Sequence, residues 1–171
     1  MAHYYDSIPE SIRKLTNQQA IDRYVAGAEV PARAIAGLTT EQLLAVPVPG
    51  TWSIQQIVVH LADSDLTAAY RMKRMIAEER PLLDALDETA FAARLGYEEQ
   101  PIREVCEIFR LNRKLLTPIL RRQPESAFER TAEHPEVGTV TLGQVLRTYA
   151  YHVDHHMEFL KKKREMLGAP L

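Results

Sequence analysis

The sequence contains little that would suit a secreted, membrane-bound or nucleic-acid-binding protein. Cys106 is its only cysteine, which excludes an internal disulfide and gives no sign of an oxidising compartment. The formal net charge is -2, so the chain has no basic excess to attract nucleic acid or an acidic membrane surface. No apolar run approaches the length of a membrane span, and the first residues lack the features of a signal peptide. We therefore expect a cytoplasmic protein with no nucleic-acid or membrane partner.

Apolar residues recur at helical spacing in four long segments, at about 16–35, 53–80, 101–123 and 141–167. No stretch shows the sustained alternation of apolar and polar residues that is typical of a strand. The length of 171 residues fits one domain, spanning residues 1–171, with room for a buried core. The sequence therefore predicts an all-α fold, namely a four-helix bundle.

The starts and connections of these helices leave local signals. Thr16, Ser53 and Thr141 each begin a capping box, in which a Ser or Thr is followed three residues later by Gln. Pro31 predicts a kink in the first helix, because proline removes a backbone hydrogen bond. The loosely patterned stretch 81–100 is longer than a normal connection between antiparallel neighbours, so it predicts a long crossover connection to a non-adjacent position.

Three of the six histidines fall within five consecutive positions of the last helix: His152, His155 and His156. Residues four apart project from the same face of a helix, so His152 and His156 can grip one cation. A metal site needs at least one further ligand, which a bundle supplies from a facing helix. His60 is the best candidate, although it lies roughly 120° from the centre of its helix's apolar stripe, a position more typical of a flank.

Several histidines, Asp65 and Trp52 could serve the packing of the fold instead of the chemistry of a site. A histidine on an apolar face is usually a hydrogen-bonded core residue, and an isolated pair is no proof of a metal. Asp65 lies on the apolar stripe of the second helix, where a hydrogen bond to a neighbouring helix is somewhat favoured over a role as a base. His3 and His134 fall in irregular segments and are expected at the surface. Trp52 is expected to pack as a lid over the helix that starts at Ser53.

Several short motifs, taken in their order and spacing, resemble the DinB/YfiT-like family. They are Gly50–Ile54 (GTWSI), Val59–Ser64 (VHLADS), His134-Pro135 with Gly138–Leu142 (GTVTL), and His152–His156 (HVDHH). The resemblance extends over about residues 28–167. It implies a four-helix bundle with a crossover connection and a metal held by His60, His152 and His156. It implies no ligand role for His155.

Three neutral imidazoles leave the charge of a divalent ion uncompensated and a coordination position open. Such an ion lowers the pKa of a bound water or holds a thiol as its thiolate. The resemblance accordingly implies either a metal-dependent hydrolase or a thiol S-transferase that uses bacillithiol, mycothiol or glutathione. Imidazole ligands favour Ni²⁺ or Zn²⁺ as the single divalent ion. Hydrolysis needs a general base, for which Asp65 and His155 are the only nearby candidates in the sequence.

A non-catalytic interpretation stays open, in which the ion pins the second helix to the fourth in a stress-related binding protein. A fourth protein ligand without an adjoining cavity would support it. An open position facing a cavity would instead support an enzyme whose substrate is a small molecule, with or without a low-molecular-weight thiol. We also expect a homodimer. This expectation rests partly on the family resemblance and partly on small apolar residues of the first two long helices that suit close packing: Ala20, Val25, Ala26, Val30, Ala68, Ala69 and Ala77.

Overall fold

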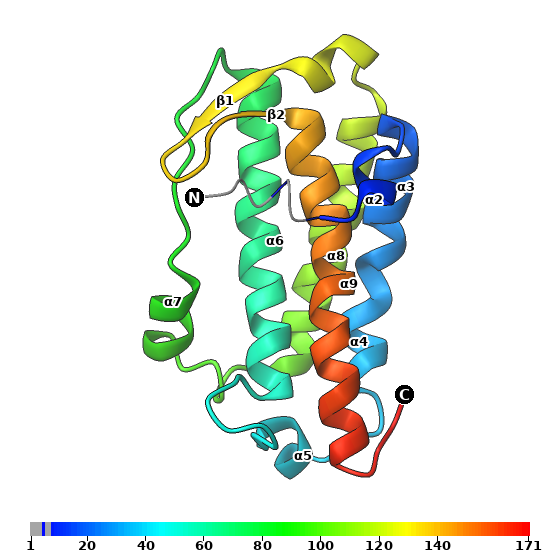
Figure 1. Cartoon of the computed structure of the whole chain (residues 1–171), viewed down its shortest axis with the longest axis vertical. Helices are drawn as coiled ribbons and strands as arrows, with labels where there is room; N and C mark the ends of the chain where they lie inside the picture. The colour runs from blue at the N-terminus through cyan, green and yellow to red at the C-terminus, as the bar shows by residue number, and fades with distance from the viewer. Residues whose placement is uncertain (1–4, 6–7) are drawn as a thin grey trace.

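The computed structural model describes residue 5 and residues 8–171 of the chain, and it confirms the predicted helical bundle (Figure 1). Its four long members are α3 with its continuation α4, then α6, α8 and α9. No helix in the described part of the chain is both long enough and apolar enough to cross a membrane. The helical elements are α2 (Glu10–Arg13), α3 (Asn17–Ala26), a 3-10 helix (Gly27–Glu29), α4 (Val30–Ile35), α5 (Thr40–Leu44), α6 (Ile54–Ala77), α7 (Glu88–Arg94), α8 (Ile102–Arg121), a second 3-10 helix (Glu125–Glu129) and α9 (Leu142–Met166).

The predicted capping boxes start the helices that carry the histidines. The hydroxyl of Ser53 accepts a hydrogen bond from the backbone N of Gln56 at 3.1 Å, and the Gln56 side chain accepts from the backbone N of Ser53 at 2.8 Å. Thr16 and Thr141 begin α3 and α9 in the same way. A fourth box, begun by Thr39, starts α5 and was not predicted. These local bonds satisfy backbone N–H groups that the first helical turn leaves unpaired.

The crossover connection is present, but the prediction that it leads to a non-adjacent helix is wrong. Helix α6 packs against both α8 and α9, and α3 packs against the same two helices. In Figure 1, α6 and α8 run in the same direction, so the chain has to return along the whole bundle before α8 begins. The length of the segment 78–101 therefore reflects the parallel orientation of two neighbouring helices.

The break in the first long helix lies at Gly27–Glu29, one turn before the predicted site at Pro31. Pro31 occupies the first turn of α4, where a missing N–H costs no helical hydrogen bond. Gly27 is needed for close packing, because a Cβ atom there would lie 2.5 Å from Nη1 of Arg113. The chain therefore changes from α-helix to 3-10 helix at the place where Gly27 packs closely against the buried Arg113.

A two-stranded hairpin between α8 and α9 was not predicted. Strand β1 (Thr131–His134) pairs antiparallel with β2 (Gly138–Thr141), and a turn between His134 and Gly138 connects the two strands. The start of the crossover pairs with the other edge of β1: the backbone N of Leu83 donates to the carbonyl of Glu133 at 2.8 Å. The hairpin therefore holds the crossover in place beside the ends of α6 and α9 that it covers in Figure 1.

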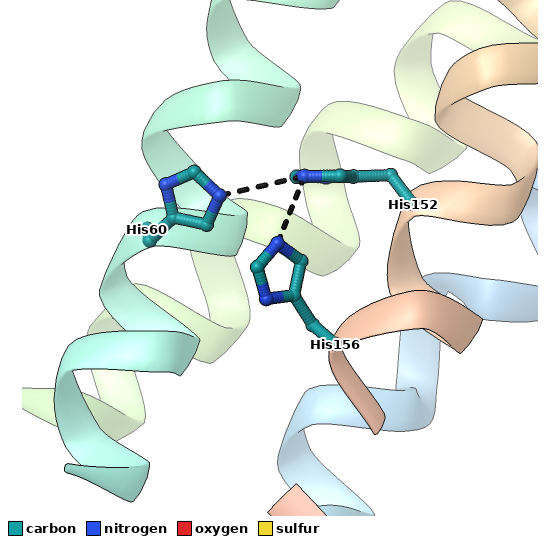
Figure 2. A group of neighbouring side chains, drawn as sticks. All are labelled: His60, His152 and His156. Atoms are coloured by element: carbon teal, nitrogen blue, oxygen red, sulfur yellow. Dashed lines mark hydrogen bonds between the residues drawn. The ribbon is translucent and has the colours of Figure 1, made fainter. Parts of the chain in front are cut away.

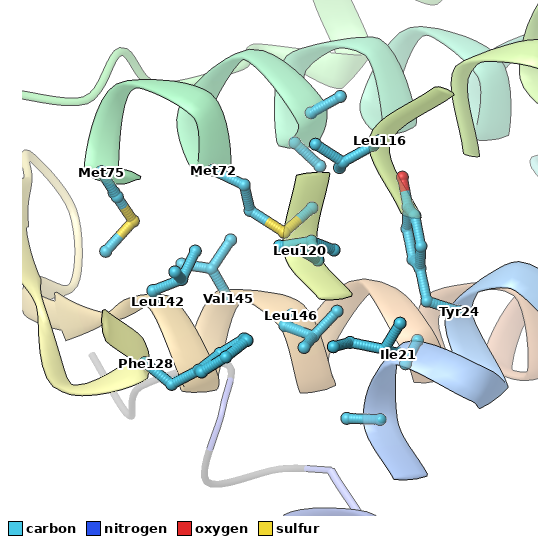
Figure 3. Packing of buried hydrophobic residues seen from close by; sticks show 14 of the residues in the cluster. Ile21, Tyr24, Met72, Met75, Leu116, Leu120, Phe128, Leu142, Val145 and Leu146 are labelled. Carbon is cyan, nitrogen blue, oxygen red and sulfur yellow. The ribbon is translucent and has the colours of Figure 1, made fainter. Parts of the chain in front are cut away.

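Apolar side chains from all four long segments fill the interior (Figure 3). Met72 of α6 lies beside Leu120 of α8, Met75 of α6 points toward Leu142 of α9, and Leu146 of α9 belongs to the same cluster. A second cluster surrounds the first half of α6 and includes its residues Ile54, Ile57, Val58 and Leu61. Burial of these side chains contributes roughly 1.5–3 kcal/mol each before the entropic cost of ordering them.

Three of the small residues that underlie the predicted homodimer are inside the monomer. Ala20 and Ala68 are fully buried, and Ala69 is 1% exposed, all within the core cluster. They pack the bundle itself, so they cannot form an interface between chains. The homodimer stays a prediction, but this part of its basis is wrong.

Candidate metal centre

Three histidine side chains point toward one another between α6 and α9 (Figure 2). The i, i+4 spacing places His152 and His156 on the α9 face that packs against α6, and His60 projects from α6 toward them. Nε2 of His152 lies 3.0 Å from Nε2 of His156 and 3.4 Å from Nε2 of His60. One nitrogen from each ring lies within 4.8 Å of the other two. The three residues expected to act together are thus brought together.

The nitrogen separations match those of imidazoles that share one ion. A metal–nitrogen bond of about 2.0–2.1 Å places two ligand atoms roughly 3.3 Å apart at a tetrahedral angle and roughly 2.9 Å apart at a right angle. The separations of 3.0 and 3.4 Å from Nε2 of His152 are close to these two values, and all three ligand nitrogens lie within 4.8 Å of one another. Two ring nitrogens at these distances make one hydrogen bond at most, so three convergent ones are better satisfied by a cation.

Burial keeps all three imidazoles in the neutral form that a metal requires. It lowers the pKa of His60 to about 4 and that of His156 to about 3. The pKa of His152 is lowered well below its ordinary value, first by burial and then by the neighbouring rings of His156 and His60. Three lone pairs are therefore available for coordination at neutral pH.

The surroundings of His60 explain why it is buried despite its flank position on α6. It is 1% exposed, because the loop before α6 folds the Trp52 ring onto it with ring centroids 4.9 Å apart. The hydroxyl of Ser64, one turn later, lies 3.4 Å from Nδ1 of His60. Trp52 therefore does more than cap the helix, since it packs directly on one of the three histidines.

Glu88 is a carboxylate near the histidines that the sequence analysis missed. Its Oε2 atom lies 3.8 Å from Nε2 of His60, and its side chain is 59% exposed. Burial raises its pKa, and the nearby carboxylates of Asp87 and Glu136 act in the same direction. Glu88 opens α7 in the middle of the crossover, a segment without a strong sequence pattern, so no local signal pointed to it.

Two cavities meet at His156. The more polar cavity has a volume of about 340 Å³ and lies between α6, α9, the crossover and the hairpin. The second, of about 430 Å³, is almost wholly apolar and adjoins the Trp52 loop. His156 lines both cavities. The side chains of the polar cavity include Arg71, Glu88, His134, Tyr149, His152 and His155, and those of the apolar one include Val48, Trp52, Ile57, Phe159 and Lys163.

Asp65, one of the two residues considered as a base, is committed to a structural network. It is 1% exposed and forms an ion pair with Arg113 at 2.8 Å. The Tyr24 hydroxyl and the Asn112 amide donate to its Oδ2 at 3.0 and 2.8 Å. Asp65 is absent from the lining of both cavities. The structure therefore supports the interpretation in which Asp65 forms hydrogen bonds to neighbouring helices.

The remaining histidines and the single cysteine have different surroundings. His155, the other residue considered as a base, lines the polar cavity and packs edge-on against the His156 ring, with centroids 5.3 Å apart. His134, which was expected at the surface, is half-buried and also lines this cavity. His3 lies outside the described residues. Cys106 is buried in α8, and burial raises its pKa to about 11, which leaves the thiol unreactive.

Comparison with known proteins identifies the family of this chain. The family model of the DinB superfamily matches residues 25–160, which is most of the chain. A putative metal-dependent hydrolase of Oceanobacillus iheyensis is 33% identical over 123 residues, covering 72% of this chain and 71% of that protein. The putative metal-dependent hydrolase YfiT of Bacillus subtilis is 29% identical over 145 residues, covering 82% and 81% of the two chains.

Solved structures show the same architecture. The fold matches that of Bacillus subtilis YfiT, described as a probable metal-dependent hydrolase with an unusual four-helix bundle topology, with a TM-score of 0.80 over 95% of this chain and 91% of that one. It also matches a mycothiol-dependent maleylpyruvate isomerase, with a TM-score of 0.66 at 14% identity over 85% of this chain and 61% of that one. The second match concerns the fold alone. The chain therefore belongs to the DinB superfamily, and proteins described as putative metal-dependent hydrolases, YfiT among them, are its relatives.

Proposed function

We propose that this protein is a metal-dependent enzyme in which His60, His152 and His156 bind one divalent ion, Ni²⁺ or Zn²⁺. The observation that carries the proposal is the convergence of three neutral imidazoles, the buried His60 with the half-buried His152 and His156, of which the last two line a cavity large enough for a small molecule. When bound, the ion supplies Lewis acidity, which activates water or a thiol. Neutral nitrogen ligands suit these two metals, whereas manganese or iron would be expected to recruit carboxylates.

Hydrolysis of a small molecule is the reaction that the site supports best. It requires a group that accepts a proton near the ion, and the Glu88 carboxylate lies 3.8 Å from His60 at the edge of the polar cavity. Asp65 cannot serve in this way, because its two oxygens already accept hydrogen bonds from three side chains. The relatives described as metal-dependent hydrolases support the same class of reaction.

Thiol S-transfer is the second candidate, and the two cavities favour it. A transferase has to bring two reactants to the ion, a low-molecular-weight thiol and an electrophile. His156 forms part of the wall of both the polar and the apolar cavity, so two molecules can approach the proposed ion from different sides. Bacillithiol, mycothiol and glutathione are the thiols to test.

A non-catalytic, metal-stabilised binding protein is the alternative from a different class. A structural site would need a fourth protein ligand, and the cluster found among the described residues contains only the three histidines. The adjoining cavities also favour a site that small molecules can reach.

The test is a turnover assay of the metal-loaded chain with a panel of esters and amides, and in parallel with each thiol and a model electrophile. We expect wild-type turnover in one arm, and a loss of at least about 100-fold in His152→Ala. Glu88→Gln should lower hydrolysis by about 100-fold while metal content stays at one ion per chain. A chain that binds its ion and turns over no substrate in either arm would favour the structural alternative.

A further inference from the structure

The side chain of Arg71 carries a charge that no partner in the described structure neutralises. It is 8% exposed and lines the polar cavity. Its Nη1 donates to the Tyr149 hydroxyl at 3.2 Å and its Nη2 to the carbonyl of Asp84, both of which are neutral acceptors. Among the described residues, no carboxylate oxygen lies within ion-pair distance of the guanidinium, whereas the buried Arg113 is paired with Asp65. A buried cation without a counter-ion is costly unless a ligand supplies one.

The Nε atom of Arg71 adds an independent observation. It is the one buried side-chain nitrogen or oxygen in the described part of the chain that has no hydrogen-bond partner. Buried polar groups are nearly always paired, so an orphaned donor at a cavity wall points to an acceptor that arrives with a ligand. The planar guanidinium suits the two oxygens of a carboxylate, which can accept in parallel from its edge.

The position of Arg71 relates this charge to the proposed metal. It lies eleven residues after His60 on α6, and helical side chains lean toward the start of their helix. Each residue adds about 1.5 Å along the helix, and the Arg71 side chain reaches back over part of that length. The guanidinium therefore lies on the order of 10 Å from the three histidines. Tyr149 connects the two places, since its hydroxyl accepts from Arg71 and its ring packs against His152 with centroids 5.6 Å apart.

We infer that the polar cavity binds a small molecule with a carboxylate or a similar anionic group, which Arg71 anchors while the opposite end of the molecule reaches the ion. This inference rests on the proposed metal site and defines its substrate class. Two other carboxylates line the cavity, Glu88 beside His60 and Glu136 on the hairpin, and neither is paired with Arg71. The carboxylates of Glu88 and Glu136 would repel an anionic group placed beside them. The anionic end of the molecule therefore binds at Arg71, which fixes the direction in which the molecule lies in the cavity.

The test uses ω-mercaptoalkanoic acids of increasing chain length, each compared with its uncharged ω-mercapto alcohol, on the Co²⁺-loaded full-length chain. A thiolate bound to cobalt gives a charge-transfer band, which reports binding without turnover. We expect the acid of best-fitting length to bind at least about tenfold more tightly than its alcohol, the usual effect of a charge-assisted hydrogen bond. Arg71→Met should abolish this preference and leave the affinity for the alcohol within about twofold.

Arg74→Met is the matched control. Arg74 also lies on α6 and donates to the crossover, at the carbonyl of Leu82 (2.6 Å), but it does not line the cavity. It should keep the preference for the acid. If Arg71→Met does not fold, Arg71→Lys, which keeps the charge and loses the planar edge, should reduce the preference without removing it.

The outcomes separate this inference from the proposed function. Equal binding of acid and alcohol by the wild type, or an unchanged preference in Arg71→Met, would overturn the anion anchor and leave the metal site standing. A chain that does not hold one Co²⁺ would overturn the metal site, and the anchor with it. A Co²⁺-loaded chain that gives no charge-transfer band with either probe would overturn the anchoring of a metal-bound molecule and leave the metal site standing.

Discussion

Asp65 of α6 and Arg113 of α8 form an ion pair that solvent does not reach. Nη2 of Arg113 lies 2.8 Å from Oδ1 of Asp65, and the two side chains are 0% and 1% exposed. Arg113 also donates to the backbone carbonyls of Tyr24 and Tyr149, at 2.9 and 3.0 Å. The pair thus joins all four long helices. Asp65 lies about one turn from His60, and Tyr149 lies one turn before His152. The ion pair therefore also fixes how far α6 and α9 are shifted along each other where the histidines meet.

Asp65→Ala is therefore expected to destabilise the fold severely. The change leaves the Arg113 charge buried without its partner, which typically costs about 3–5 kcal/mol of unfolding free energy. Urea denaturation measures the loss. Asp154→Ala is the matched control, because Asp154 pairs with Arg23 at 2.6 Å on the surface, with both side chains more than 40% exposed. The control should cost less than about 1 kcal/mol. Comparable losses in the two variants would refute the structural role of the buried pair.

The single tryptophan should report metal binding. The Trp52 ring centroid lies 4.9 Å from that of His60, so an ion on the histidines would lie within a few ångströms of the indole. Ni²⁺ has a partly filled d shell and should quench the fluorescence strongly, whereas Zn²⁺, with a filled shell, should not. A fluorescence titration tests this, with His152→Ala expected to abolish quenching. Undiminished emission from a chain shown by mass to hold nickel would contradict the placement.

The metal-free protein should lose stability in acid because of its buried histidines. Their folded-state pKa values are lowered, to about 4 for His60, so below about pH 6.5 the unfolded chain binds more protons than the folded one. Stability is then fully present above pH 6.5 and falls as the pH drops toward 4. For His60 alone the loss between pH 7.5 and 4 is about 2–3 kcal/mol. Urea midpoints across this range should change less in His60→Gln; an equal pH dependence in that variant would exclude His60 as the source.

We still expect a homodimer, through a different surface from the one predicted. The outer face of α8 exposes an apolar stripe at i, i+3, i+7 spacing: Ile108, Leu111 and Leu115 are 46%, 42% and 67% exposed. Such a stripe suits an isologous contact between two copies. Sedimentation equilibrium at micromolar concentration should give twice the 19.5 kDa monomer mass, and Leu115→Glu should shift the protein to monomer. A wild type that sediments as a monomer would rule the dimer out.

Features that depend on local chemistry could be predicted from the sequence. The capping boxes at Ser53 and Thr141 involve residues only three positions apart, and they place the starts of α6 and α9 correctly. The pairing of His152 with His156 follows from helical geometry alone. This covers the helices and two of the three histidines.

Features that depend on tertiary packing could not be predicted in this way. His60 appeared to lie on a flank, but α6 is covered on several sides, by α8, α9 and the Trp52 loop, so a single apolar stripe does not describe its buried surface. The need for a ligand on a facing helix made His60 the best candidate, and the resemblance to a known family supported it against its flank position. Asp65 and its partner Arg113 are 48 residues apart, and Glu88 reaches the site through the path of the crossover. The short hairpin strands lack an apolar alternation and form where neighbouring segments supply hydrogen bonds.

Metal stoichiometry is the most direct test of the central claim that His60, His152 and His156 bind one ion. The chain should be purified without an affinity tag or added metal, titrated with Ni²⁺ and Zn²⁺, and weighed by native mass spectrometry. We expect one ion per chain, and a loss of affinity of more than about 100-fold for His60→Ala, His152→Ala and His156→Ala, since even residues behind the ligands contribute about 10- to 100-fold. His155→Ala, which changes the neighbouring histidine, should bind as the wild type does. Full stoichiometry with unchanged affinity in His152→Ala would contradict the account.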